Sequence, residues 1–327
     1  MYKMFMKPTS KVITLFLVII SQAWAGSPEQ RDFSTSDITK LVMFGTGTPM
    51  PDPAHNGPAV GIVVNGQIYL VDVGTGIWHG LGREMPRYGG AGAVDGLSAQ
   101  NIALNQMFIT HLHSDHTLGL PSVILSPWTL GKTTPPHIYG PPGTKDMIEY
   151  ILKAYRRDID FRVYSPSRTN NTGWRAVGHD LPKPGLVYED ENVKVTAFPV
   201  CHSHWPEAYA YRFVTPDRVI TVSGDTRPCP GMEDAARDVD ILVYSVYSEV
   251  IQNAFPHPKN PEKTRRIKQL SQSSAREVAE LAKRVNPGLL VLYHEQIWTG
   301  DPEQNVKEIR EAGYTGKVIA SRDRDVF

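Results

Sequence analysis

Short apolar and β-branched runs recur along the whole chain. Continuous runs of this kind, separated by polar and turn-forming residues, are typical of strands that are buried in a sheet. The expected strands cover residues 41–44, 60–64, 68–71, 107–109, 193–200, 209–214, 219–222, 241–244 and 289–293.

A second, helical spacing of apolar residues lies between and after these runs. It is clearest over residues 274–285, where Ser274 and Glu277 have the spacing of a capping box that begins a helix. Further helices are expected over residues 145–155 and 302–312, the latter ended by Gly313. The mixture indicates an α/β protein with helix-covered sheets. Residues 165–185, rich in Pro, Gly, Asn and Thr, are expected to form a long surface excursion.

The first residues have the features of a secretory signal peptide. Three lysines without an acidic residue precede the apolar run 12–20, and Ala23-Trp24-Ala25 has the small-x-small pattern of a cleavage site. The alternative, a membrane anchor, is disfavoured because the run is well below the roughly 20 residues that span a bilayer. We therefore expect residues 1–25 to be removed, residues 26–327 to form the folded domain, and the protein to be secreted or periplasmic without a stable membrane anchor.

Composition and charge narrow the class of partner. The chain has 327 residues, of which 41% are hydrophobic, so it can bury a full core. It carries 34 basic and 34 acidic side chains, and removal of the three lysines before residue 12 makes the mature chain mildly acidic. Basic residues are scattered except for a cluster at residues 263–268, which we interpret as a solvated helix face. This charge pattern does not favour nucleic acid as a partner.

The chain has only two cysteines, Cys201 and Cys229. Two cysteines exclude both a disulfide scaffold and a cysteine-rich zinc module. A single bridge and two free thiols are both compatible with the sequence, because the geometry of the pair cannot be read from it.

The candidate chemistry is concentrated in Thr110-His111-Leu112-His113-Ser114-Asp115-His116, directly after an expected strand. In an extended or tight-turn backbone, His111 and His113 project to the same side and can bind one ion, while Asp115 and His116 turn toward a second. Imidazole and carboxylate ligands without thiolate favour zinc, with manganese and iron as alternatives, in an open catalytic site.

This His-x-His-x-Asp-His motif resembles the signature of the metallo-β-lactamase superfamily. Gly45-Thr46-Gly47-Thr48-Pro49, Val71-Asp72-Val73-Gly74, Gly140-Pro141-Pro142-Gly143-Thr144, Ser223-Gly224-Asp225-Thr226-Arg227-Pro228 and Leu290-Val291-Leu292-Tyr293-His294 extend the likeness over nearly the whole mature chain. Together they look like the branch that contains ribonuclease Z and the zinc-dependent arylsulfatases. The resemblance implies an αββα four-layer sandwich and two zinc ions per chain.

The resemblance also implies a ligand set. One metal would be held by His111, His113 and His202, and the other by Asp115, His116 and His294, with Asp225 bridging both. His202 and His204 both fit the third motif, and we choose His202 because it directly follows a strand. His204 would then face the substrate. Asp115 and His204 are therefore the candidate catalytic residues, and Trp205, Tyr247 and Trp298 are candidate pocket residues.

The remaining histidines are weaker candidates for a functional role. We interpret each as an isolated structural or surface residue: His55, His79, His137, His179 and His257.

One departure from the ribonuclease Z pattern bears on the substrate. That branch typically has a histidine just before the helix that is expected here at Ser274, whereas this chain has Gln272. The sequence therefore favours an exported, arylsulfatase-like hydrolase of small anionic esters, with a homodimer left open. The alternative is a phosphodiesterase or a ribonuclease Z-like 3′ tRNA endonuclease.

Overall fold

The computed structural model describes residues 32–327 except 34, 37, 84–103, 167, 255–259, 296–300 and 302. The expected signal peptide, His257 and Trp298 lie outside the described residues. Among the helices that are described, none combines the length and the apolar character needed to cross a membrane.

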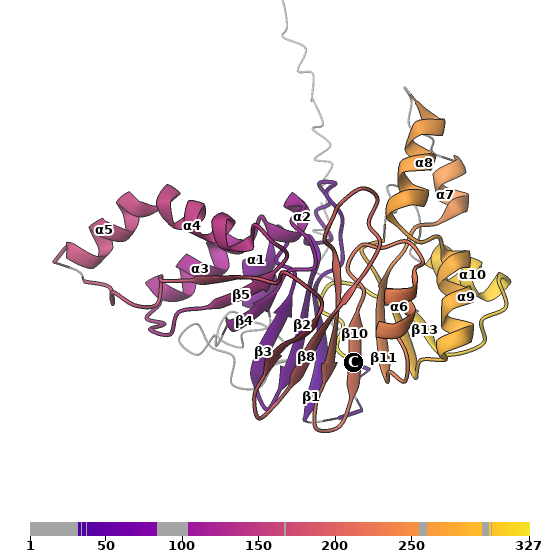
Figure 1. Cartoon of the computed structure of the whole chain (residues 1–327), viewed down its shortest axis with the longest axis horizontal. Coiled ribbons are helices and arrows are strands. Elements are labelled where there is room, and N and C mark those ends of the chain that lie inside the picture. The colour runs from indigo at the N-terminus through magenta and orange to yellow at the C-terminus, as the bar shows by residue number, and fades with distance from the viewer. Residues whose placement is uncertain are drawn as a thin grey trace, which may run out of the picture.

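The first sheet has six strands in sequence order (Figure 1). They are β1 (Thr39–Gly45), β2 (Ala59–Val64), β3 (Gln67–Val71), β4 (Leu104–Phe108), β5 (His137–Gly140) and β6 (Val177–Asp180). The pairs β1–β2 and β2–β3 are antiparallel, whereas β3 to β6 are parallel to one another.

The second sheet has seven strands in the order β13-β12-β11-β10-β9-β8-β7. They are β7 (Gly185–Glu189), β8 (Lys194–Pro199), β9 (Tyr209–Val214), β10 (Val219–Val222), β11 (Ile241–Ser245), β12 (Leu289–Tyr293) and β13 (Val318–Ala320). Strands β7 to β10 are antiparallel neighbours, and β10 to β13 are parallel. Consequently β8, β10, β11 and β12 all end at the same edge of this sheet.

Helices cover the outer faces of the two sheets (Figure 1). They are α1 (Ile77–Arg83), α2 (Ser114–Thr117), α3 (Leu120–Thr129), α4 (Thr144–Ala154), α5 (Arg156–Tyr164), α6 (Pro230–Ala235), α7 (Glu249–Ala254), α8 (Pro261–Ser271), α9 (Ala275–Val285) and α10 (Glu303–Glu311). In Figure 1 the helices α1 to α5 lie on the side of the first sheet, and α6, α9 and α10 on the side of the second.

Three separate apolar cores hold the four layers together. Along β1, Leu41 and Met43 point into the core between the sheets, while Val42 and Phe44 point into the core beneath the first helical layer. A third core joins the second sheet to α6, α9 and α10. Because side chains alternate between the two faces of a strand, a strand that is covered on both faces reads as a continuous apolar run. The expected αββα sandwich is confirmed.

The predicted strands and helices are confirmed, whereas β6 was not predicted. Every expected strand and helix is present with small shifts at its ends, and Ser274 and Glu277 form the expected capping box. The expectation of a surface excursion over residues 165–185 is wrong in part, because β6 lies within it and closes the edge of the first sheet. The sequence of β6, Val-Gly-His-Asp, has no apolar run, so periodicity could not reveal it.

Candidate metal centre

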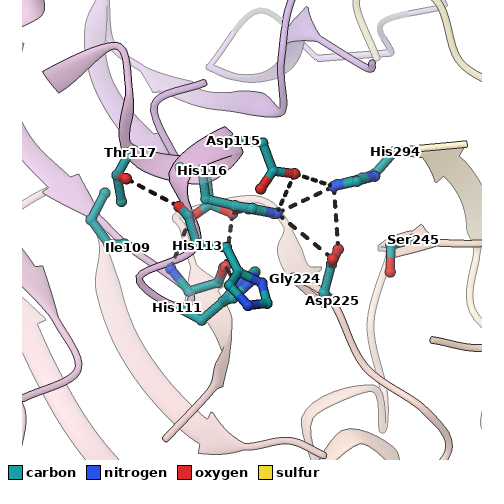
Figure 2. Close-up of polar contacts among 12 residues, drawn as sticks. Ile109, His111, His113, Asp115, His116, Thr117, Gly224, Asp225, Ser245 and His294 are labelled. Atoms are coloured by element: carbon teal, nitrogen blue, oxygen red, sulfur yellow. Dashed lines mark hydrogen bonds and ion pairs between the residues drawn. The ribbon is translucent and has the colours of Figure 1, made fainter. Parts of the chain in front are cut away.

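The proposed ligands lie just after the carboxyl ends of β4, β8, β10 and β12. Figure 2 shows the side chains of Asp115, His116, Asp225 and His294 pointing toward one another. Three groups of side chains there have ligand atoms that all lie within 4.8 Å of one another. The groups are His111, His113 and His202; Asp115, His116 and His294; and His111, His116 and Asp225. The structure thus brings all seven residues of the expected ligand set together, and Asp225 lies between the two triads.

Local backbone geometry places two of these side chains. Gly224, directly before Asp225, has a φ of +59°, and a Cβ there would lie 2.7 Å from the Cβ of Thr110, so this position requires glycine. His294 has a φ of 48°, a left-handed conformation that is uncommon for a residue with a side chain. Strain of this kind persists where the surrounding structure enforces it, and it is often found at functional sites.

Hydrogen bonds around the histidines fix which ring nitrogen faces the centre of the cluster. His202 Nδ1 lies 2.7 Å from the carbonyl oxygen of Ser271 and must donate to it. His116 Nδ1 lies 2.7 Å from Asp72 Oδ2. Each ring therefore turns its Nε2 atom toward the centre of the cluster.

His111 is oriented in the same way through an intermediate hydroxyl. Thr110 Oγ1 donates to Asp72 Oδ2 at 2.8 Å, so it can only accept from His111 Nδ1, which lies 3.0 Å away. The Nε2 lone pair of His111 then faces His113 Nδ1 at 2.9 Å.

Asp72 is therefore a functional residue whose role the sequence did not reveal. Its buried carboxylate accepts from the Thr110 amide as well as from Thr110 Oγ1 and His116, so it orients two imidazoles at once. The signal that could have found it is an acidic residue directly after a buried strand, in the motif Val71-Asp72-Val73-Gly74.

The electrostatics of the cluster favour a positive charge between its histidines and carboxylates. Although burial opposes ionisation, His294 and His116 hold the pKa of Asp225 well below its ordinary value. Burial, and then the charge of His116, lowers the pKa of His111, so that ring is neutral. The pKa of His116 is raised well above its ordinary value, because Asp72 and Asp225 outweigh the effect of burial. A cation at its Nε2 atom would satisfy the same two carboxylates.

The donor set fits a metal centre of nitrogen and oxygen ligands. Asp225 Oδ1 is buried and has no hydrogen-bond partner in the described part of the chain. His202 Nε2 and His111 Nε2 are both acceptors and face His113 Nδ1 at 3.1 and 2.9 Å, but this nitrogen carries at most one hydrogen to share between them. A pair of zinc-class cations would satisfy these converging acceptors and the Asp225 carboxylate oxygen, which forms an ion pair with His294 Nε2 at 3.5 Å.

The cluster forms the floor of an open cleft of 760 Å³. His204 lines its wall, is exposed, and belongs to none of the three ligand groups. Trp205 also lines it and packs against His113, with ring centroids 4.5 Å apart. Tyr247 does not line the cleft: it is buried and contributes to a separate pocket between α7 and α8, so its expected pocket role is wrong.

Gln272 lies in the wall of the same cleft and contacts the central carboxylate. Its Nε2 atom donates to Asp225 Oδ2 at 2.8 Å, while its buried Oε1 atom has no described partner. The preceding residue, Ser271, holds His202 through its carbonyl oxygen. The segment that follows α8 therefore positions two members of the cluster.

The histidines outside the cluster have other contacts. His137 and His179 are not isolated as expected: their rings stack, with a nitrogen–nitrogen distance of 2.9 Å, because β5 and β6 pair. His55 contacts Asp52 in an exposed loop, and His79 is exposed on α1.

Cys201 and Cys229 are free thiols in this structure. Burial and the neighbouring Cys229 thiol raise the pKa of Cys201. Neither sulfur belongs to the ligand groups, which agrees with a site made of imidazoles and carboxylates.

Comparison with known proteins gives a consistent picture. A family model described as a beta-lactamase superfamily domain matches residues 94–294. Ribonuclease Z of Mycobacterium marinum is 31% identical over 262 residues, covering 79% of this chain and 86% of that protein. Ribonuclease Z of Mycobacterium bovis is 29% identical over 293 residues, covering 88% of this chain and 96% of the relative.

Solved structures share the fold at lower identity. The metallo-β-lactamase fold protein YhfI from Bacillus subtilis superposes with a TM-score of 0.64 at 16% identity, covering 89% of this chain and all of that one. The short form of human tRNase Z superposes with a TM-score of 0.63 at 22% identity, covering 88% of this chain and 98% of that one.

Proposed function

This chain belongs to the metallo-β-lactamase superfamily as a metal-dependent hydrolase, and we propose that its substrates are phosphodiesters, which it cleaves at a centre of two zinc ions. The observation that carries the proposal is the pair of histidine and aspartate triads joined by Asp225 at the floor of an open cleft. Paired metal sites of this kind are used by phosphatases and nucleases for in-line displacement at phosphorus.

The relatives favour phosphate esters over sulfate esters as the substrate class. The sequence favoured sulfate esters on the strength of Gln272, the mildly acidic charge and the expected export. Relatives that share about 30% identity along most of the chain are ribonuclease Z, whose substrates are phosphodiesters, and no relative reported above supports sulfate ester hydrolysis. We therefore place phosphodiesters first and keep sulfate esters as an outcome of the test.

Each residue of the site has a task in this proposal. His111, His113 and His202 would hold one zinc ion, and Asp115, His116 and His294 the other, with Asp225 between them. When bound, such ions lower the pKa of a water toward about 7 and stabilise charge on the phosphoryl oxygens.

Three side chains would then act on the substrate. The hydrogen bond from His294 holds the pKa of Asp115 below its ordinary value against the effect of burial, so its carboxylate stays ionised and can orient the attacking water. His204, on the cleft wall, is placed to donate a proton to the leaving oxygen. The Trp205 ring offers a flat surface against which an aryl group or a base can stack.

Parallel assays on one zinc-loaded preparation test the proposal. A bis-aryl phosphate, an aryl sulfate and a tRNA precursor should be compared by kcat/KM, since that ratio reports differential stabilisation of the transition state. We expect the phosphodiester to exceed the aryl sulfate by at least about tenfold, or about 1.4 kcal/mol. Asp225→Ala serves as the inactive control. If the aryl sulfate is cleaved faster than both phosphodiesters, the arylsulfatase-like hypothesis is favoured instead.

Export of the mature chain is a separate part of the proposal. It rests on the sequence of residues 1–25 alone. N-terminal sequencing of protein recovered from the periplasmic fraction tests it, and a chain that begins at Met1 in the cytoplasmic fraction would contradict it.

A further inference from the structure

Helix α8 projects beyond the body of the fold (Figure 1). Its residues Ile267 and Ser271 line the cleft together with His202 and Gln272. The helix thus continues the wall of the cleft outward into solvent.

One face of α8 combines basic and apolar side chains. Lys263, Arg266, Ile267, Leu270 and Ser271 have relative positions 0, 3, 4, 7 and 8, which is the spacing of a single helical stripe. The stripe begins at the cleft with Ser271 and runs about 12 Å outward to Lys263, at 1.5 Å per residue. Ile267 and Leu270 are 49% and 36% exposed, so they add apolar surface to the same stripe.

The positive charges on this stripe are not neutralised within the described part of the chain. The side chains of Lys263 and Arg266 are exposed, and neither forms an ion pair or hydrogen bond with another described residue. Glu262 is the single acidic residue of α8, and Glu207 is the acidic residue of the cleft wall outside the metal cluster.

The opposite face of α8 is occupied by the protein itself. Arg265 donates to Asn253 Oδ1 on α7, and the ammonium group of Lys268 lies 5.5 Å from the centre of the Tyr247 ring. Burial lowers the pKa of Lys268 to about 8. The basic residues of α8 therefore fall into two classes: two that pack against α7 and Tyr247, and two that face solvent on the cleft side.

We propose that the stripe Lys263, Arg266, Ile267 and Leu270 binds a single-stranded oligonucleotide next to the scissile phosphodiester. The proposal rests on the proposed function, because it extends the substrate of the same cleft. Proteins bind single strands through cations that contact the phosphates and aromatic side chains on which the bases stack. Trp205 inside the cleft supplies the aromatic ring, and the exposed Ile267 and Leu270 add apolar surface along the stripe.

The size of the surface sets the kind of nucleic acid that fits it. Lys263 and Arg266 are three residues apart, or about 4.5 Å along the helix axis, so they can contact only about two phosphates of a strand that carries one charge per about 3.4 Å. A short single strand is therefore the nucleic acid that suits a chain whose basic residues are otherwise scattered. The cluster at residues 263–268 is then more than a solvated helix face.

Binding of a fluorescein-labelled oligouridylate to the zinc-loaded protein tests the inference by anisotropy, read before a measurable fraction is cleaved. The variants are Lys263→Gln, Arg266→Gln and their double variant. Arg265→Gln is the matched control, since it removes the same charge from the same helix on the other face. Turnover of a bis-aryl phosphate is measured in parallel, because a small substrate can occupy the cleft without contacting Lys263 or Arg266, which do not line it.

We expect the double variant to bind the oligonucleotide more weakly and to lose about 1.4 from the slope of log K against log salt, at about 0.7 per phosphate contact. Its kcat/KM for the oligonucleotide should fall in proportion, with bis-aryl phosphate turnover changed less than about twofold. Arg265→Gln should leave the slope unchanged.

Several outcomes would overturn the inference. An unchanged slope in the double variant, or an equal loss in Arg265→Gln, would show that the stripe is not a binding surface. Charge-dependent binding to phosphatidylserine vesicles without binding to the oligonucleotide would assign it to a membrane. Failure of the proposed function would give a different result: the unaltered protein would not hydrolyse the bis-aryl phosphate, although it would still bind the oligonucleotide in the anisotropy assay.

Discussion

Replacement of Asp72 by asparagine should weaken metal binding although Asp72 touches no metal in our account. Asp72 accepts three hydrogen bonds, from the Thr110 amide on Oδ1 and from Thr110 Oγ1 and His116 Nδ1 on Oδ2. An asparagine has one acceptor oxygen, so its amide group must face either the Thr110 N–H or the pair of donors on the other side. Neither orientation satisfies all three partners.

The magnitude follows from the kind of contact that is lost. Residues that orient metal ligands typically contribute 10- to 100-fold to metal affinity, which is about 1.4 to 2.7 kcal/mol. Turning the amide toward His116 would in addition favour the wrong tautomer of that ring and, through Thr110, of His111. Loss of a buried hydrogen bond to a charged group should also lower the stability of the metal-free protein by about 1.5 to 3 kcal/mol.

A matched control separates metal affinity from stability. Asp323 is another buried carboxylate that accepts from the amide and hydroxyl of a threonine, Thr46, but it contacts none of the seven clustered residues. Asp323→Asn should destabilise the protein similarly and leave zinc affinity, measured by competition with a chelating dye, unchanged. If Asp72→Asn and Asp323→Asn retain the same zinc affinity, the orienting role of Asp72 is refuted.

Two further substitutions test the third motif and the residue beneath Asp225. His202→Ala should lose zinc and activity, whereas His204→Ala should keep zinc and lower turnover, because only His202 lies within the ligand cluster; zinc content by mass spectrometry decides, and the reverse pattern would show that the motif is misaligned by two residues. Gln272→Leu should lower the stability of the metal-free protein by about 1 to 3 kcal/mol, since it removes the amide that donates to the buried Asp225 carboxylate. Zinc should restore most of this loss in thermal denaturation, and an equal loss with and without zinc would assign Gln272 to packing alone.

The sequence predicted those parts of the fold that depend on strong local patterns. Strands that are buried on both faces have continuous apolar runs in the sequence. Helix α9 could be predicted from its capping box and its regular apolar stripe. Strands such as β6 form only because a neighbouring strand pairs with them, and their residues carry no such pattern. The contact between His137 and His179 results from the same strand register, so it could not be predicted from the sequence either.

In the candidate site, the proposed metal ligands could be predicted from the sequence, whereas the residues that orient them could not. Four of the seven proposed ligands could be predicted because they lie in one dense motif, residues 111–116, and the other three, at positions 202, 225 and 294, followed from the family resemblance. The residues that orient them could not be predicted, because Asp72 reaches His116 across 44 positions and Ser271 reaches His202 across 69. Contacts at such separations depend on how the two sheets bring their edges together, which no local pattern encodes.

The central claim is that two zinc ions held by this cluster make the chain a phosphodiesterase, and stepwise zinc addition to the metal-free protein tests it most directly. Hydrolysis of a bis-aryl phosphate should be followed at each addition together with bound zinc. Our account predicts no turnover without zinc and a plateau only at about two ions per chain, because Asp225 joins two complete triads. Full phosphodiester turnover at one ion per chain, or no turnover at two, would contradict it.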